Sequence, residues 1–222
     1  MLILLGEFTR KNSRAGYLLE KYNWGRMWSK RVHIKPEELV PGEPLGFDNG
    51  AYMYWNKKTP LHWRDFPESL FIRRLELLPK PPIVAVAPDL PLAGNNSLLF
   101  SLWWVRQLPR LPWYLAIQDG MDAKQVESSL DEFAGVFLGG SNTLKLEAAD
   151  WCSLAKRRGK KFHYGRCSTF RRVRDARMAG ADSVDSVTPV LRISERKRDG
   201  RRAFARWVQE ATDTNPQKEL FT

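Results

Sequence analysis

Cysteine and histidine are scarce in this chain of 222 residues, which holds two cysteines and three histidines. Cys152 and Cys167 form no CxxC pair, and so few histidines leave no combination of residues suited to zinc. We expect both cysteines to be small buried side chains in a reducing, cytoplasmic setting. No metal or other cofactor is predicted.

Long hydrophobic runs are missing as well. The apolar segment at residues 2–5 is too short to cross a membrane, and it lacks the charged start of a signal peptide. It is typical of a buried first strand. No membrane partner is therefore expected.

Acidic residues are too few to balance the basic ones. Lys and Arg number 36 against 25 Asp and Glu, giving a net charge of +11 and a pI near 9.8. The basic residues cluster late, at residues 156–161, 171–177 and 192–206. Such clustering favours a polyanionic partner, with nucleic acid first, over a basic surface that binds nothing.

Short apolar runs recur along the chain, and most are followed by helical patterns, which predicts a parallel sheet built from βαβ units. The predicted strands are Leu2–Leu5, Arg31–Ile34, Pro44–Phe47, Ile83–Ala87, Trp113–Ile117, Gly135–Leu138, Phe162–Tyr164 and Ser183–Val187. Eight strands close a TIM-type (β/α)8 barrel, here a compact or irregular one because such barrels usually need about 250 residues. We predict one domain over residues 1–212 and a polar tail over 213–222.

Helix starts and loops follow from local signals. Asp122 and Ser168 are predicted N-caps, and Ser194 precedes the last predicted helix. Residues 7–43 and 51–65 combine aromatic and basic residues with scattered Pro and Gly, and we expect them to form long loops around the mouth of the barrel.

Polar residues follow several predicted strands, and in a parallel barrel these ends meet on one face. Asp48, Asp89 and Asp185 each end an apolar run, which favours function because an idle carboxylate there is costly to desolvate. Asp119 and Asp182 are equally well explained as turn or cap residues.

The ordered strand-end motifs resemble the tRNA-guanine transglycosylase superfamily, and most closely its bacteriophage branch that places 7-deazaguanines in DNA. The resemblance covers residues from about 44 to 187. Its motifs are Asp48-Asn49-Gly50-Ala51-Tyr52, Pro88-Asp89, Gln118-Asp119-Gly120, Gly139-Gly140 and the run from His163-Tyr164-Gly165-Arg166 through Ala179-Gly180-Ala181-Asp182-Ser183-Val184-Asp185. Each motif alone is weak, whereas the ordered series is specific.

The resemblance implies roles for single residues. Asp185 corresponds to the nucleophile that attacks the sugar C1′ and displaces guanine, and Asp48 corresponds to the general base for the incoming base. The substrate-binding residues that it implies are Asp89, Gln118, Gly139, Gly140, His163, Tyr164 and Arg166. The free 7-deazaguanine base is then a second substrate.

The chain departs from the tRNA enzymes of this family, which carry a zinc-binding insertion with three cysteines and a histidine. No cysteine or histidine follows Thr188 here. We therefore expect no zinc site, and DNA is favoured over tRNA. The residues predicted to bind the polymer are Arg171, Arg172, Arg174, Arg192, Arg196, Lys197 and Arg198. Five aromatic residues are candidates for stacking on a base or for packing between loops: Tyr52, Tyr54, Trp55, Trp63 and Tyr164.

Three alternatives stay open: a transglycosylase that acts on tRNA, an N-glycosidase that only removes the base, and a non-catalytic nucleic-acid-binding barrel. A homodimer is compatible with the resemblance, but no self-complementary patch is readable. The expected location is the cytoplasm, that of the host if a bacteriophage encodes the chain.

Overall fold

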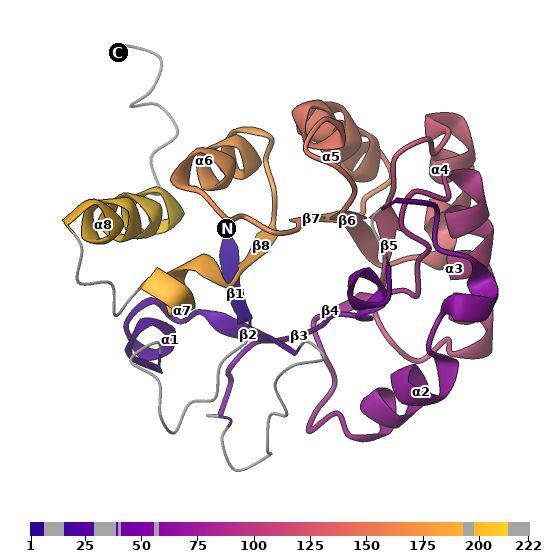
Figure 1. Ribbon diagram of the computed structural model, residues 1–222, viewed down its shortest axis with the longest axis horizontal. Helices are drawn as coiled ribbons and strands as arrows, with labels where there is room; N and C mark the ends of the chain where they lie inside the picture. The colour runs from indigo at the N-terminus through magenta and orange to yellow at the C-terminus, as the bar shows by residue number, and fades with distance from the viewer. Residues whose placement is uncertain (7–15, 29–38, 40, 56–57, 193–197, 213–222) are drawn as a thin grey trace.

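The computed structural model describes residues 1–6, 16–28, 39, 41–55, 58–192 and 198–212 (Figure 1). Eight parallel strands form a closed barrel in sequence order. The strands are β1 (Leu2–Gly6), β2 (Gly25–Trp28), β3 (Leu45–Phe47), β4 (Val84–Val86), β5 (Trp113–Ile117), β6 (Gly135–Leu138), β7 (Lys161–Tyr164) and β8 (Ser183–Ser186). The chain therefore folds as a TIM-type (β/α)8 barrel, as predicted.

Pairing between the first and last strands closes the barrel, with Leu4 opposite Asp185. All neighbouring strands are parallel, so their carboxyl ends share one rim. In such barrels the residues after each strand build the functional site at this rim.

Helices surround the strands, as Figure 1 shows. The α-helices are α1 (Gly16–Tyr22), α2 (Glu68–Glu76), α3 (Asn95–Gln107), α4 (Ala123–Ser129), α5 (Ala148–Arg157), α6 (Phe170–Met178), α7 (Thr188–Arg192) and α8 (Arg198–Thr212). Short 3₁₀ turns lie at η3 (Ala51–Met53), η4 (Trp63–Asp65), η5 (Leu130–Glu132) and η6 (Leu144–Glu147). The main core lies between the strands and this helical layer.

The inside of the barrel is narrow, and glycines make room for its side chains. Leu4, Met27, Val84 and Tyr114 form the interior cluster. A Cβ atom on Gly135 would lie 2.5 Å from the Tyr114 ring, so the large ring fits only because that position has no side chain. Small residues facing large ones allow this barrel to close with few residues.

The second strand of the barrel is Gly25–Trp28. The predicted strand Arg31–Ile34 lies outside the described residues. The sequence pattern does not predict this strand of the barrel, because Gly25 and Arg26 interrupt its apolar run. Arg26 is buried with Glu43, and the two side chains form an ion pair. Pairing with Glu43 allows the charge to sit inside the fold.

The local helix signals were partly right. Asp122 caps α4, with its carboxylate accepting a hydrogen bond from Gln125 N at 2.9 Å. Thr169, not Ser168, caps α6 through a bond from Arg172 N at 3.3 Å. Ser194 and the tail 213–222 lie outside the described residues.

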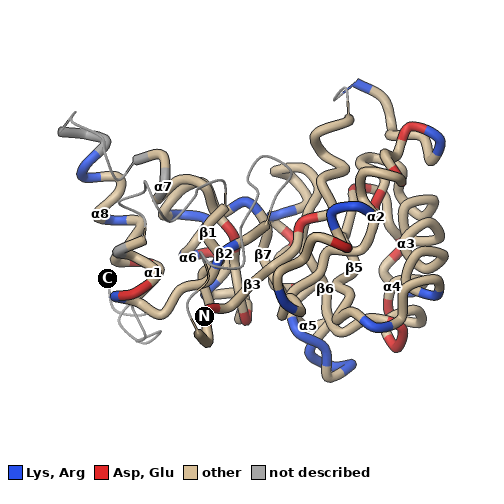
Figure 2. Tube along the Cα trace, turned by 90° about the horizontal axis from the view of Figure 1, so that it is seen from below, with Lys and Arg blue, Asp and Glu red and all other residues tan. Residues whose placement is uncertain are grey.

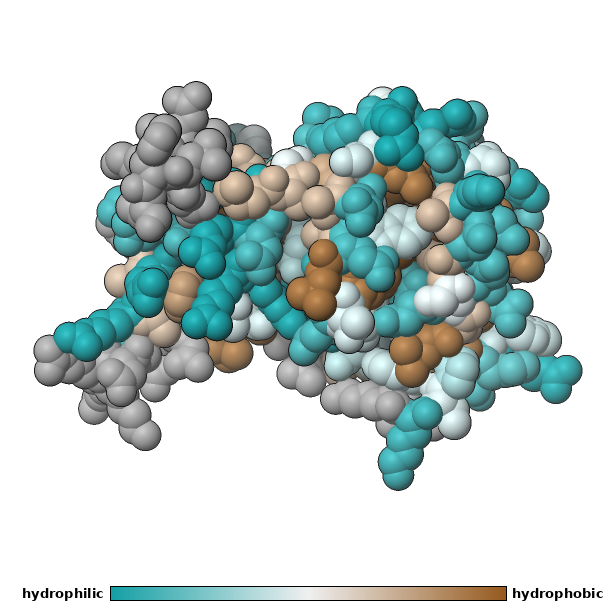
Figure 3. All heavy atoms as spheres, turned by 90° about the horizontal axis from the view of Figure 1, so that it is seen from above, coloured by the Kyte–Doolittle hydropathy of each residue, from teal (hydrophilic) through white to brown (hydrophobic). Residues whose placement is uncertain are grey.

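The described helices include none that is long and apolar enough to cross a membrane. On the face shown in Figure 3, hydrophilic side chains predominate and apolar ones lie in small separate patches. This matches the composition, in which charged residues make up 27%.

Candidate active site

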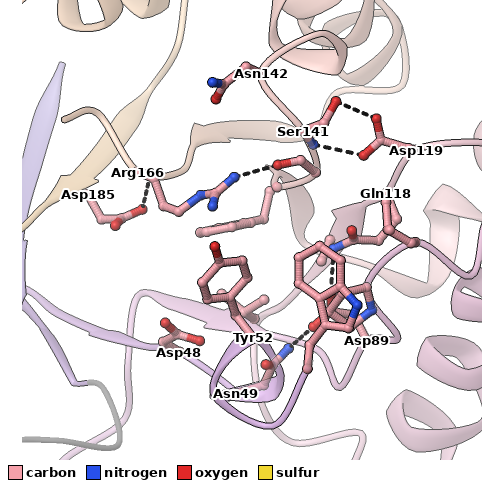
Figure 4. Close-up of a pocket in the computed structure, with 18 residues that line it drawn as sticks. Asp48, Asn49, Tyr52, Asp89, Gln118, Asp119, Ser141, Asn142, Arg166 and Asp185 are labelled. Carbon is pink, nitrogen blue, oxygen red and sulfur yellow. Dashed lines mark hydrogen bonds between the residues drawn. The ribbon is translucent and has the colours of Figure 1, made fainter. Parts of the chain in front are cut away.

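A pocket of about 290 Å³ opens at the carboxyl rim of the barrel (Figure 4). Its volume lies near the lower end of the range of small-molecule sites, which suits a ligand the size of a nucleobase. Its walls combine four carboxylates and one guanidinium with aromatic and glycine residues: Asp48, Asn49, Tyr52, Trp55, Val86, Asp89, Pro91, Leu92, Ala116, Gln118, Asp119, Phe137, Gly139, Gly140, Ser141, Asn142, Arg166 and Asp185.

Asp185 near the end of β8 presents a carboxylate of which one oxygen is already held. Its Oδ1 accepts hydrogen bonds from the backbone N–H of Arg166, at 3.0 Å, and lies 3.0 Å from His163 Nε2. Within the described residues, no hydrogen bond reaches Oδ2. Two donors therefore orient the carboxylate and leave Oδ2 for a ligand.

His163 contacts Asp185 from behind and does not line the pocket. It is fully buried, its Nδ1 lies 2.8 Å from Ser183 Oγ, and its ring stacks on Phe137 at 4.8 Å. With the Ser183 hydroxyl donating to Nδ1, the ring donates its Nε2–H to Asp185. The structure thus places His163 behind the carboxylate, where its ring does not reach the pocket.

Tyr164 also lies away from the pocket, because adjacent strand residues point to opposite faces and His163 points inward. The Tyr164 ring is buried beneath Lys145, whose Nζ lies 4.4 Å from the ring centroid. Neither Tyr164 nor His163 lines the pocket. Their substrate contacts stay a prediction of the resemblance.

Lys145 is a structural residue that the sequence did not single out. Its Nζ donates to Leu138 O at 3.0 Å and to Gly165 O, so it joins the ends of β6 and β7. Burial lowers the pKa of Lys145 to about 7. The residue braces the two segments that carry Gly139-Gly140 and Arg166.

Asp48 follows β3 in a turn braced from behind. Its Oδ1 accepts the backbone N–H of Gly50 at 2.8 Å, and Gly50 takes the left-handed conformation that favours glycine. The buried guanidinium of Arg74 donates to the carbonyls of Asp48, at 2.7 Å, and Asn49, at 3.0 Å. Burial lowers the pKa of Arg74. This turn holds the Asp48 carboxylate at the pocket.

Asp89 lies at the floor of the pocket with an amide on each side. Asn49 Nδ2 donates to its Oδ1 at 2.6 Å, and Gln118 Nε2 donates to its Oδ2 at 2.5 Å. Burial raises the pKa of Asp89 to about 7, against the opposing hydrogen bonds from Asn49 and Gln118. Asn49 also bonds Ala87 O and Ala51 N, so it fixes this carboxyl group. Its position inside the Asp48 motif was the only sequence signal for that role.

Gly139 and Gly140 bring backbone to the pocket wall. A Cβ atom on Gly140 would lie 2.3 Å from Leu144 Cδ2, and its φ of 58° is left-handed. The neighbouring Asp119 accepts from Ser141 N at 2.8 Å and from Ser141 Oγ at 2.5 Å. Asp119 therefore holds the glycine turn to the end of β5.

The aromatic candidates divide between the pocket and elsewhere. Tyr52 and Trp55 line the pocket with ring centroids 5.6 Å apart, and Phe137 forms a further wall. Trp63 lies outside it and is 56% exposed. Planar rings at the pocket suit a planar ligand.

The predicted polymer-binding residues are placed in part. Arg171 and Arg174 are exposed on α6, while Arg172 bonds the pocket residue Asn142. Arg192 ends α7 and Arg198 begins α8, and their side chains lie outside the described part. Arg196 and Lys197 lie outside the described residues altogether.

Within the described part of the chain, no three His, Cys, Asp or Glu side chains form a group that could hold a metal ion. No protein-family model and no curated protein sequence matches this chain.

Proposed function

We propose that the chain is a transglycosylase that exchanges guanine in DNA for a 7-deazaguanine base through a covalent link between Asp185 and the sugar C1′. The observation that carries this proposal is the Asp185 carboxylate, oriented by two donors on Oδ1 and open at Oδ2 in a pocket walled by planar rings. The resemblance of the strand-end motifs points to the same chemistry.

In the first step, Asp185 Oδ2 attacks C1′ and the C1′–N9 bond breaks, with its electron pair passing to the departing guanine. A carboxylate nucleophile divides a difficult substitution into two easier ones. In the second step, the incoming base loses its N9 proton to Asp48, and its N9 attacks C1′ and displaces Asp185. The sugar keeps its configuration because it is inverted twice.

Asp89 is suited to hold the base through its donor edge. Guanine carries N1–H and an amino group side by side, and a carboxylate accepts both in a forked arrangement. Each Asp89 oxygen already accepts one amide hydrogen and retains a further lone pair. A base bound there would have its imidazole side toward Gly139-Gly140 and Arg166.

DNA is proposed as the polymer because the motifs most closely resemble the DNA-modifying branch, and Arg171 and Arg174 are exposed on α6. Phosphate contacts from such residues give affinity without sequence preference. A base within a duplex must also be flipped out to reach the pocket.

The proposal is tested by incubating the protein with guanine-containing DNA and with tRNA, each together with labelled guanine or 7-deazaguanine bases. Label entering DNA is the expected result. Label in tRNA alone would move the substrate to RNA, and release of guanine without reinsertion would identify an N-glycosidase. Binding of nucleic acid without release or exchange of any base would refute the enzymatic proposal.

A further inference from the structure

Arg166 carries the only Lys or Arg side chain among the described residues that line the pocket. It takes a left-handed conformation with φ of 55°, which is uncommon for a residue other than glycine. This conformation lets one residue do two things. Its backbone N–H donates to Asp185, while its side chain extends across the pocket toward the glycine turn (Figure 4).

One N–H group of the Arg166 guanidinium is bonded to the protein, and its other N–H groups are available to a ligand. Arg166 Nη2 donates to Gly140 O at 2.5 Å, and Cζ lies 5.0 Å from the centre of the Tyr52 ring. A guanidinium has five N–H donors, and within the described residues the side chain makes no other hydrogen bond. Donors therefore remain to meet acceptors on a ligand.

The pocket thus offers acceptors at one place and donors at another. Asp89 accepts hydrogen bonds, and Arg166 donates them. Guanine has the matching edges, with N1–H and the amino group on one and O6 and N7 on the other. Arginine paired with O6 and N7 is the commonest specific contact to guanine in DNA complexes. Adenine would set its own amino group against the guanidinium.

We infer that Arg166 reads N7 and O6 of the guanine that is removed, and thereby restricts removal to bases that have a nitrogen at position 7. This inference rests on the proposed function and adds a specificity-determining residue to it. A 7-deazaguanine has a C–H at position 7, which accepts no hydrogen bond. Once installed, it is a poor substrate for a second removal.

The same contact acts on the departing base. When the C1′–N9 bond breaks, its electron pair enters the purine and spreads to N7 and O6. A guanidinium at these atoms stabilises that charge only as it develops, which lowers the barrier and not merely the binding energy. With carbon at position 7, the hydrogen bond at that position is lost, and only the contact to O6 remains.

The test compares Arg166→Gly with the wild-type protein on oligodeoxynucleotides that contain guanine or 7-deazaguanine at one site. Glycine keeps the left-handed backbone and the N–H that bonds Asp185, and removes only the side chain. We expect single-turnover removal of guanine to fall about 100-fold, as for loss of one charge-stabilising donor, while the slow removal of 7-deazaguanine changes little. Asn23→Gly is the matched control, since Asn23 is also left-handed and does not line the pocket.

Equal slowing on both substrates would overturn the inference, because it would mean that Arg166 merely positions Asp185. If Arg166→Gly failed to fold by circular dichroism, Arg166→Lys would replace it, with a smaller selective loss expected because lysine lacks the planar fork. If the wild-type protein exchanged no base, the proposed function would fail, and calorimetry with free bases would decide the inference. Tighter binding of guanine than of 7-deazaguanine, lost in the variant, would support it, and equal affinities or no binding would refute it.

Discussion

The two ends of β8 carry two aspartates three residues apart that the fold uses in different ways. Asp182 accepts from Lys156 Nζ at 2.5 Å and from Phe162 N at 2.7 Å, with Lys161 Nζ at 3.4 Å. Partial burial alone would raise its pKa, but these hydrogen bonds and charges leave the pKa of Asp182 below its usual value. These bonds join the end of α5 to the amino ends of β7 and β8.

Asp185 shows the opposite arrangement. Its Oδ1 is held by a backbone N–H and an imidazole, and its side chain is 17% exposed at the pocket. No lysine or arginine side chain forms an ion pair with it within the described residues. Oδ2 of Asp185 is therefore left for a ligand, whereas both carboxylate oxygens of Asp182 are bonded by protein donors.

The basic residues also differ between the two ends of the barrel in whether they pair with carboxylates. Around the end of α5, Lys156, Arg157 and Arg158 pair with Asp182, Glu127 and Asp131, and Figure 2 shows basic residues gathering there. This cluster lies at the amino-end face, away from the pocket. On α6, Arg171 and Arg174 are exposed. Clustering along the sequence therefore does not show which basic residues are paired with carboxylates of the same fold.

The largest effect is expected from exchanging the two aspartates for asparagine one at a time. Asp185→Asn removes the proposed nucleophile, and we expect exchange to fall by on the order of 10⁴-fold in a labelled-base assay. Asp182→Asn should leave exchange within about threefold and lower the free energy of unfolding by about 1 kcal/mol in urea. Full exchange by Asp185→Asn, or equal loss in both variants, would show that the two aspartates do not differ in function.

Asp89 gives a stability effect with a definite sign. Its pKa in the folded protein is about 7, raised by burial from an ordinary value near 3.8. Between pH 4 and 7 the folded state binds more protons there than the unfolded state does, so stability falls as pH rises and levels off above 7. The span is as much as about 4 kcal/mol. Urea unfolding across this range should show a weaker fall for Asp89→Asn, and identical pH profiles would contradict the burial argument.

The substitution Ser183→Ala tests whether the bond between Ser183 and His163 is needed to orient Asp185. Without the hydroxyl, His163 Nδ1 loses its 2.8 Å partner and the proton on Nε2 is no longer fixed. We expect exchange to fall on the order of tenfold, with a changed pH–rate profile, because one oriented hydrogen bond is worth about 1 kcal/mol. A loss of stability with an unchanged pH–rate profile would show that Ser183 contributes to packing and does not orient His163.

The smallest effect concerns the polymer. Replacing Arg171 and Arg174 by alanine should lower the slope of log affinity for DNA against log salt by about two, one for each phosphate contact. Replacing Arg157 and Arg158 at the opposite face is the matched control and should leave the slope unchanged. Equal changes from both pairs would show that DNA does not distinguish the two faces.

The barrel and its rim were predictable because strand-end position carries information in a parallel barrel. Asp48, Asp89, Gln118, Gly139-Gly140 and Asp185 follow short apolar runs, and closure brings such ends together. The second strand was missed because Gly25 and the ion-paired Arg26 break its apolar pattern.

Which residues touch the pocket was less predictable, because it depends on side-chain direction. His163 and Tyr164 sit in a strand-end motif, yet one supports Asp185 and the other faces the helices. The role of Lys145 could not be predicted, because it depends on hydrogen bonds to two carbonyls that are distant in sequence. Such contacts are set by packing and leave no local signal.

The most direct test of the proposed mechanism is to look for the covalent intermediate. The protein is incubated with guanine-containing DNA and no incoming base, denatured, digested with protease and nuclease, and the peptides are examined by mass spectrometry. We expect a deoxyribosyl ester on Asp185 and none on Asp48 or Asp182. An ester on another residue, or exchange without any ester, would contradict it.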